Sequence, residues 1–219
     1  MTKTRVAPHL IEYKEPIKEV STYIGIPPYQ YSIFIGLLLS DGWVHIPYNK
    51  NIENRHARIK FRQPYANVEY SLSVFNEISD YCEKPPYYSG QGLPTRHVMI
   101  ATSCLPCFTK LYSMFNLYKK KVLPHNIYDL LTPVALANFV MASGIKLKGR
   151  GIQLRTYSLA IPEVVTLMNV LMVRYRLTCS LQSVNNSHSI YIHRSSLSTL
   201  RTIVKSHSKI PPGIFLYQL

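Results

Sequence analysis

Acidic residues are scarce in this 219-residue chain. It has 11 Asp and Glu against 25 Lys and Arg, which gives a formal net charge of +14 at pH 7 and a pI near 9.7. The imbalance is steepest from Thr132 to Leu219, where Glu163 is the one acid beside ten Lys and Arg. A field of this sign attracts polyanions, so the charge favours nucleic acid as the partner.

Long apolar runs are also lacking. The longest nearly apolar stretch, Val164 to Val173, is shorter than the roughly 20 residues that span a bilayer, and it contains Thr166 and Asn169. No apolar segment of the kind that a secretory signal needs follows the N-terminus, and three acids by residue 19 are unlike a mitochondrial transit peptide. We therefore expect neither membrane insertion nor secretion, and either synthesis in the compartment where the chain works or a cryptic import signal.

Cysteine is scarce too. Cys82, Cys104, Cys107 and Cys179 are too few and too scattered for a disulfide framework, and the isolated CxxC pair lacks the four ligands of a structural zinc site. We expect Cys104 and Cys107 to be ordinary buried thiols near a helix start. Apolar residues, by contrast, make up 47% of the chain, which is typical of an ordered globular protein.

An internal repeat is the main feature that is present. The apolar block Tyr31–Leu39 ends at Ser40-Asp41-Gly42, and a second block, Pro133–Ala142, ends at Ser143-Gly144. A Gly after an apolar run is typical of a helix end, and Pro133 is typical of a helix start. The two glycines are 102 residues apart, which indicates two fused half-domains rather than a short-period solenoid.

The segments after the two apolar blocks repeat as well. Alternating residues around an Asn-rich turn and a Gly-rich turn predict hairpins over residues 43–62 and 145–157. Each hairpin is followed by an amphipathic helix, two short strands and a last helix. The four helices are predicted at Val68–Tyr81 and Pro106–Leu117 in the first copy, and at Pro162–Tyr175 and Ser196–Ser206 in the second. The predicted order is αββαββα, twice.

Two segments carry a family likeness. Phe34–Gly42 and Leu136–Gly144 resemble the signature helices of the LAGLIDADG homing endonucleases and intron maturases. Lys121–Ile127 and Leu130–Ala137 are similar to the join between the halves of the single-chain, intron-encoded yeast mitochondrial members. The likeness covers the chain from about Tyr29 to its C-terminus.

The resemblance implies an α+β fold in which the duplicated αββαββα unit forms two curved antiparallel sheets, arranged as a saddle. The halves would be residues 29–125 and 126–219, in a monomer with an internal pseudo-twofold axis. Residues 1–28, with four prolines, would be an extended N-terminal arm that serves as a linker or docks onto a partner.

The resemblance also implies that the signature helices pack side by side. Gly36 and Ser40, four residues apart on one helical face, and Ala137 on the other helix are small enough for that approach. Asn138 departs from the family's preference for a small residue.

Nucleic-acid contacts are implied for the two hairpins. Cations at i, i+2 spacing share one strand face, so Arg58, Lys60 and Arg62 can follow a groove together. A solvated polar face is the alternative for any single residue. The candidates are Lys50, Arg55, Arg58, Lys60 and Arg62 in the first hairpin, and Lys146, Lys148, Arg150 and Arg155 in the second.

The family's cleavage chemistry is present in one half. Each signature helix of the family ends with an acid that holds a divalent metal; Asp41 keeps that position, but Ser143 replaces the second acid and Ala142 precedes it. Magnesium shared between two phosphodiesters needs carboxylates, so Asp41 alone should hold it weakly. Lys121 resembles the first of the family's active-site lysines. Its counterpart would fall in residues 213–217, which contain no lysine.

These losses favour a protein that binds without double-strand cleavage and requires no cofactor. RNA is favoured over DNA, in a mitochondrial maturase-like factor or a structural part of a ribonucleoprotein such as the mitochondrial ribosome. The alternative is a homing endonuclease or nickase that uses Mg²⁺ at Asp41. A third reading is a DNA-binding regulator.

Overall fold

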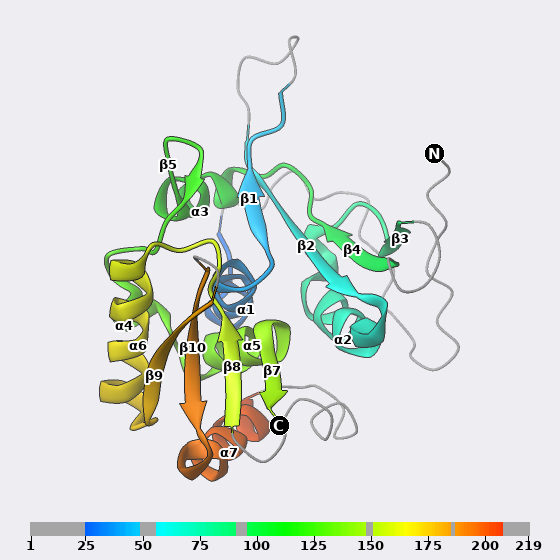
Figure 1. The fold of residues 1–219 in the computed structure, drawn as a ribbon. Helices are drawn as coiled ribbons and strands as arrows, with labels where there is room; N and C mark the ends of the chain where they lie inside the picture. The colour runs from blue at the N-terminus through cyan, green and yellow to red at the C-terminus, as the bar shows by residue number, and fades with distance from the viewer. Residues whose placement is uncertain (1–24, 49–55, 91–95, 148–150, 185–186, 208–219) are drawn as a thin grey trace. The chain divides into compact units, whose positions relative to one another are not determined.

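Figure 1 shows the computed structural model of the chain, which describes residues 25–48, 56–90, 96–147, 151–184 and 187–207. These residues form two compact units. One holds the described residues of 25–30 and 41–113, and the other holds the described residues of 31–40 and 114–207. The halves 29–125 and 126–219 rest on the sequence repeat and stay a proposal, and most of the 1–28 arm lies outside the described residues.

The first unit contains a four-stranded antiparallel sheet in the order β1-β2-β4-β3. Its strands are β1 Trp43–His45, β2 Arg58–Pro64, β3 Tyr87–Ser89 and β4 His97–Ala101, followed by most of helix α3 Pro106–Phe115. Helix α2, Val68–Ile78, packs on one face of this sheet, where Leu72 and Val98 form a buried cluster. The opposite face, called the open face below, bears the half-buried or exposed side chains of β2.

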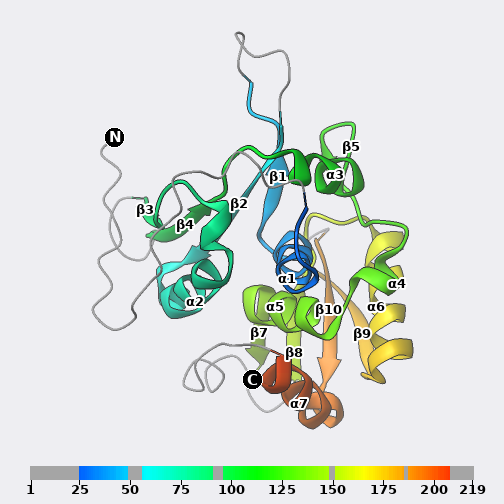
Figure 2. The same ribbon diagram turned by 180° about the vertical axis from the view of Figure 1, so that it is seen from behind.

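The second unit contains a matching sheet in the order β7-β8-β10-β9. Its strands are β7 Gly144–Leu147, β8 Gly151–Arg155, β9 Cys179–Val184 and β10 Ser187–His193. Its helices are α4 Ile127–Leu130, α5 Pro133–Ser143, α6 Ile161–Tyr175 and α7 Leu197–His207, with most of α1, Pro28–Leu39. Figure 2 shows α5 and α7 on one face of this sheet, and Figure 1 shows the other face open.

The element order confirms the α+β prediction. The chain runs α1-β1-β2-α2-β3-β4-α3 and then α5-β7-β8-α6-β9-β10-α7, which is αββαββα twice. The helix predicted to reach Leu117 ends at Phe115, because residues 116–117 pair with Lys120–Lys121 as the hairpin β5-β6. Neither this hairpin nor α4 was predicted, since both lie in the join between the repeats.

Helices α1 and α5 are apolar on every side, as expected of helices enclosed by other elements. Residues 32–39 and 135–143 are all buried. The α5 start reflects local chemistry: the Thr132 side chain accepts a hydrogen bond from the Ala135 amide at 3.2 Å, and Pro133 occupies the first turn. These two helices are therefore core helices that are buried on all sides, and not amphipathic helices with one exposed face.

Gly36 on α1 lies against the backbone of α5. A Cβ added at this position would lie 2.4 Å from the Ala135 carbonyl oxygen and 2.7 Å from the Asn138 Cβ. Ala137 and Ser40 are buried, and Asn138 satisfies its own amide by donating to the Val134 carbonyl at 3.0 Å. The hydrogen bond within its own helix explains how a polar side chain is accommodated there.

Glu163 has a structural role. Its carboxylate accepts a hydrogen bond from the Ala160 amide at 2.7 Å, at the start of α6, and another from the Leu123 amide at 2.8 Å. A carboxylate at a helix N-terminus is stabilised by the exposed amides and the helix dipole. The one acid of residues 132–219 thus ties the inter-repeat segment to α6.

The cysteine side chains differ from the expectation that Cys104 and Cys107 are buried. All four cysteines are free, but Cys104 is exposed and Cys107 half-buried, so the prediction that both are buried was wrong. Cys104 precedes α3 and Cys107 lies in its first turn, where side chains can face solvent.

Among the described residues no helix is both long and apolar enough to cross a membrane.

Candidate nucleic-acid interface

Asp41, which follows α1 in the chain, is held by a chain of side-chain amides. The Gln63 amide donates to the Asp41 carboxylate at 3.2 Å, and the Gln63 oxygen accepts from the Asn67 amide at 2.9 Å. Gln63 is fully buried on the α2 side of β2, so its position is fixed by packing. Burial, and secondarily the nearby Asp41 charge, raise the pKa of Tyr70. The first acid is therefore oriented by its surroundings.

Lys121 binds the end of α1. Its ammonium donates to the carbonyl of Ser40 at 2.7 Å, and Ser40 is the residue immediately before Asp41. The last carbonyls of a helix have no partner within the helix and carry negative partial charge. A cation at this carbonyl stabilises the helix end.

Ser143 is placed very differently from Asp41. It is fully buried, and its hydroxyl donates to the Phe139 carbonyl of its own helix at 2.8 Å. The carbonyl of the preceding residue, Ala142, accepts a hydrogen bond from the Arg155 guanidinium at 3.3 Å. The second helix end thus has a neutral, internally bonded hydroxyl and a neighbouring cation.

The fit of a divalent metal differs between these two helix ends. In the first half Asp41 offers one carboxylate, and magnesium at phosphoryl sites often uses one or two carboxylates together with waters and phosphate oxygens. In the second half the hydroxyl of Ser143 is bonded within α5 and the nearby side chain is positive, so the residues do not fit a metal. Within the described ranges no group of three or more His, Cys, Asp or Glu could hold one.

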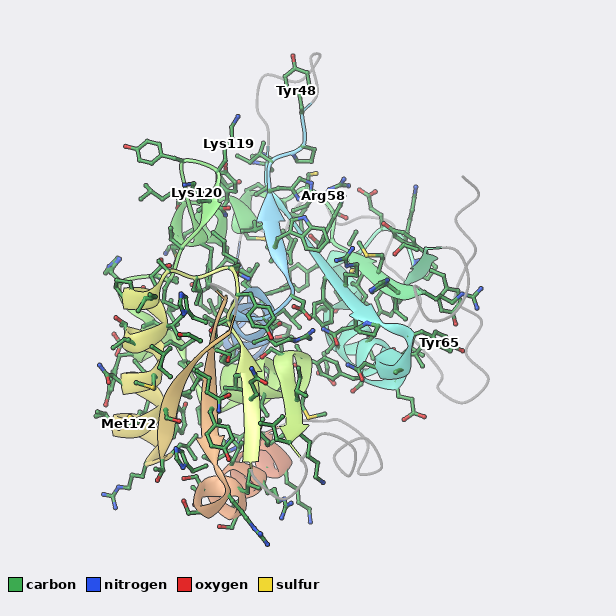
Figure 3. All side chains as sticks on the ribbon, in the orientation of Figure 1. Tyr48, Arg58, Tyr65, Lys119, Lys120 and Met172 are labelled. Carbon is green, nitrogen blue, oxygen red and sulfur yellow. The ribbon has the colours of Figure 1, made fainter. Side chains whose placement is uncertain are left out.

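The open face of the first sheet is basic. Along β2 the side chains alternate, so Arg58, Lys60 and Arg62 share the face opposite to buried Ile59 and Phe61. This confirms the predicted i, i+2 arrangement. Figure 3 shows Arg58 beside β1 and β2. The other first-hairpin candidates, Lys50 and Arg55, lie outside the described residues.

His45 and Trp43 join these cations on the same face through the β1-β2 register. Trp43 pairs with Lys60 and His45 with Arg58, and the Arg58 Nε donates to the His45 Nε2 at 3.5 Å. Burial lowers the pKa of His45, and Lys60 and Arg58 lower it further. Burial and the two neighbouring cations therefore both favour the neutral form of this imidazole over its charged form.

The described residues on the open face of the second sheet are mostly neutral. Gln153 and Arg155 share it with Tyr191 and His193, because Tyr191 pairs with Gln153 across the β8-β10 ladder. The Tyr191 and His193 rings lie 4.9 Å apart. Amide, phenol and imidazole groups can hydrogen-bond to or stack on bases, whereas they add little phosphate attraction.

Lys146 does not share that face with Arg155. It pairs with buried Ile152, so it lies on the helix side of the edge strand β7, where it is exposed. The register reverses its face relative to Arg155 because Ile145, not Lys146, pairs with Gln153. Lys148 and Arg150 lie outside the described residues.

Sequence reasoning missed Gln63, His45 and the role of Arg155 at the α5 end. Gln63 could have been noticed as a polar residue in the buried phase of an alternating strand. The cation–carbonyl contacts have no sequence signal, because Lys121 and Ser40 are 81 residues apart.

Three comparisons place this geometry among known proteins. The model of the LAGLIDADG DNA endonuclease family matches residues 31–200. The chain is 27% identical, over 192 residues, to the cytochrome b mRNA maturase bI2 of Saccharomyces cerevisiae, covering 80% of this chain and 44% of that protein. It spans 44%, 60% and 64% of the length of three curated relatives, the first of which is this maturase.

Solved structures show the same fold. The homing endonuclease I-WcaI bound to its DNA recognition sequence has a TM-score of 0.74 and 23% identity, covering 90% of this chain and 88% of that one. I-DmoI in complex with DNA and Ca has a TM-score of 0.50 and 13% identity, covering 86% and 96%. With a family model matching most of its length, the chain belongs to the LAGLIDADG DNA endonuclease family.

Proposed function

We propose that this chain binds structured RNA through the open faces of its two sheets and does not cleave both strands of a duplex. The observation that carries the proposal is the α5 end, where Ser143 is buried and bonded to Phe139 while Arg155 binds the adjacent carbonyl. A helix end of this kind offers no carboxylate to a metal. The basic face of Arg58, Lys60 and Arg62 does not depend on that loss.

The maturase-like role draws support from the similarity to a cytochrome b mRNA maturase. Phosphate contacts and shape can hold a folded RNA without the acid pair that cleavage requires. We accordingly place the protein in the mitochondrion, acting on intron RNA as a monomer. A variant of this proposal is that the protein is a structural part of a ribonucleoprotein such as the mitochondrial ribosome. Co-sedimentation of the protein with ribosomal particles would support that variant.

The test compares two probes of one sequence: RNA transcribed from the region around the protein's own gene, and duplex DNA of that region. Binding is measured from 50 to 300 mM salt, a range over which about six phosphate contacts change affinity by orders of magnitude. The expected result is tighter binding to the folded RNA at every salt concentration. Equal or tighter binding to the duplex would contradict the RNA assignment and favour a DNA-binding regulator.

A homing endonuclease or nickase is the second candidate, favoured by the Asp41–Gln63–Asn67 network. In that case Asp41 would hold Mg²⁺, and the ion would neutralise developing phosphate charge. Supercoiled plasmid carrying the gene region is incubated with the protein and Mg²⁺, with Asp41→Asn as the matched control. Linear product that disappears in the control would overturn the non-cleaving proposal, and nicked circles alone would show one working half.

A further inference from the structure

We propose that the hairpin β5-β6 is a base-stacking site, at which the Tyr118 ring stacks on an unpaired base of the RNA while Lys119 and Lys120 contact neighbouring phosphates. This site rests on the proposed RNA binding, and it belongs to neither of the two four-stranded sheets. The two short strands of the hairpin, Asn116–Leu117 and Lys120–Lys121, are joined by a turn of Tyr118 and Lys119.

The turn of this hairpin is made of residues that its backbone conformation disfavours. Tyr118 and Lys119 have φ values of 49° and 64°. Positive φ at both residues is typical of a two-residue hairpin turn, and Asn and Gly adopt it most readily. A larger side chain makes this conformation costly, so an Asn-Gly turn would close the same hairpin with less strain. The need for a turn therefore does not explain why a tyrosine and a lysine occupy these positions, and strained positions of this kind cluster where a protein contacts its ligand.

The tip of the hairpin faces solvent. The Tyr118 side chain is 91% exposed, and Lys119 and Lys120 are exposed beside it. Figure 3 shows both lysines at this hairpin. A ring this exposed contributes little to packing within the chain, whereas its flat face is available to a base.

The base of the hairpin is fixed to the second unit. The Val122 amide donates to the carbonyl of buried Phe115 at 2.9 Å, directly outside the paired strands. The Lys121 ammonium donates to the Ser40 carbonyl at the end of α1. The ring is therefore carried on an anchored support, and a tyrosine loses the freedom of only two side-chain torsions when it stacks.

The sequence around the ring is basic. Residues 84–128 contain six Lys and Arg and no Asp or Glu, and three of the six are Lys119, Lys120 and Lys121. Proteins that bind single strands combine an aromatic ring, which stacks on a base, with cations that follow the phosphates. The tip of β5-β6 offers this combination within three consecutive residues.

An anionic membrane surface is the alternative partner for an exposed tyrosine beside lysines. The exposed apolar side chains of the hairpin are Leu117 and Tyr118. They would bury less area than a single myristoyl chain, which by itself gives only marginal membrane binding. One stacked base, by contrast, changes the affinity for RNA by about tenfold. The exposed tip therefore favours an unpaired RNA base.

The test measures the affinity of Tyr118→Ala for two probes: folded RNA transcribed from the region around the protein's own gene, and fully paired duplex RNA of the same sequence. Loss of the ring should weaken binding to the folded RNA about tenfold, and binding to the duplex less than about twofold, because paired bases offer no free face. The slope of log affinity against log salt should stay unchanged, since the ring has no charge. Val173→Ala, which removes an exposed apolar side chain from α6, is the control and should bind both probes as the unmodified protein does.

The phosphate contacts are tested separately. Lys119→Gln combined with Lys120→Gln should reduce the salt slope for the folded RNA by about 1.4, the value for two contacts to a single strand. The control removes the same charge at two other exposed positions, Lys84→Gln and Lys205→Gln. An equal reduction in both variants would contradict the contacts of Lys119 and Lys120, because it would assign the effect to net charge.

A second variant of the turn separates stacking from folding. Tyr118→Asn combined with Lys119→Gly places the favoured residues in the turn, so the protein should unfold at the same or a higher temperature. It should nevertheless lose at least as much affinity for the folded RNA as Tyr118→Ala. If the hairpin only connects the two repeats, this variant binds the folded RNA as the unmodified protein does, which would overturn the proposal.

Three further outcomes would also overturn it. An equal loss on folded and fully paired RNA would contradict stacking on an unpaired base. Binding to vesicles of phosphatidylcholine and phosphatidylglycerol that depends on Tyr118, with unchanged RNA affinity, would assign the hairpin to a membrane surface. If the unmodified protein binds no RNA, the proposed function fails together with this site, whereas RNA binding that is insensitive to Tyr118 removes this site alone.

Discussion

The two signature helices share their fold and differ in the chemistry at their ends. After α1 comes an acid oriented by Gln63, which Asn67 holds in turn, whereas α5 ends in a buried serine beside the Arg155–Ala142 contact. The described parts of the two sheets differ as well: cations dominate the open face of the first sheet, and neutral polar groups dominate that of the second. A duplicated fold can thus keep its packing while the two copies take on different roles, because packing and surface chemistry depend on different residues.

The largest expected effect concerns the basic open face of the first sheet. Changing Arg58, Lys60 and Arg62 together to Gln should lower RNA affinity about a thousandfold, or about 4 kcal/mol, and reduce the salt slope by about 2 to 3. The reason is loss of up to three phosphate contacts from one strand face. The measurement is fluorescence anisotropy over a salt series.

The control for this triple variant removes the same charge from exposed positions outside the two sheets. Its members are Lys84, Lys110 and Lys205, each changed to Gln. If control and test variants lose affinity equally, net charge rather than the basic face governs binding, and the contrast between the sheets has no functional meaning.

The next effect concerns the packing that both helices share. Gly36→Ala should destabilise the fold by about 3 kcal/mol, because the new Cβ would lie 2.4 Å from the Ala135 carbonyl oxygen, which is backbone and cannot rotate away. Urea unfolding measures the change. The double variant with Asn138→Gly should recover only part of the loss, because the carbonyl contact remains. Full recovery would show that the Asn138 side chain, and not the Ala135 carbonyl, limits how closely α1 and α5 approach.

A smaller effect tests the amide network found at the first end. Gln63→Leu removes the donor to Asp41 and the acceptor for Asn67, which should cost about 2 kcal/mol in the free energy of unfolding. Combined with Asp41→Asn, it should show a coupling of about 1 kcal/mol, whereas combination with Ser143→Ala should be additive. If both pairs of substitutions are additive, the hydrogen bonds of Gln63 do not contribute to holding the Asp41 carboxylate.

The smallest effect is a titration on the basic face. Burial first, and then Lys60 and Arg58, lower the pKa of His45. The unfolded chain therefore binds a proton more readily at this site, so the associated stability is present above the ordinary histidine pKa of 6.5 and is lost as the pH falls through the lower folded value. Lys60→Gln should raise the pKa of His45 only in part, because burial is the larger cause.

Proton NMR of the His45 ring measures this shift. Lys84→Gln, which removes an exposed charge in the same unit, is the control and should leave the titration where it was. RNA binding should raise the pKa of His45, since a phosphate near Arg58 and Lys60 favours the charged imidazole. A pKa unmoved by RNA would place the phosphates away from this part of the face.

Much of the molecule was predictable from local patterns. The apolar blocks at residues 31–39 and 133–142 predicted α1 and α5, and the alternation at residues 58–62 predicted the shared face of Arg58, Lys60 and Arg62. The inter-repeat hairpin β5-β6 was missed because it has no Asn-Gly turn: Tyr118 and Lys119 adopt positive φ values of 49° and 64° instead. Figure 3 shows Lys119 and Lys120 at this hairpin.

By itself the sequence determined the repeat, the αββαββα order, the excess of positive charge and the missing second acid, since each of these is a matter of residue type and spacing along the chain. Tertiary structure alone decided which cation meets which helix end, that Gln63 reaches Asp41, and that Lys146 faces away from Arg155. These depend on strand register and on contacts between residues up to 81 positions apart, and local periodicity contains no information about either.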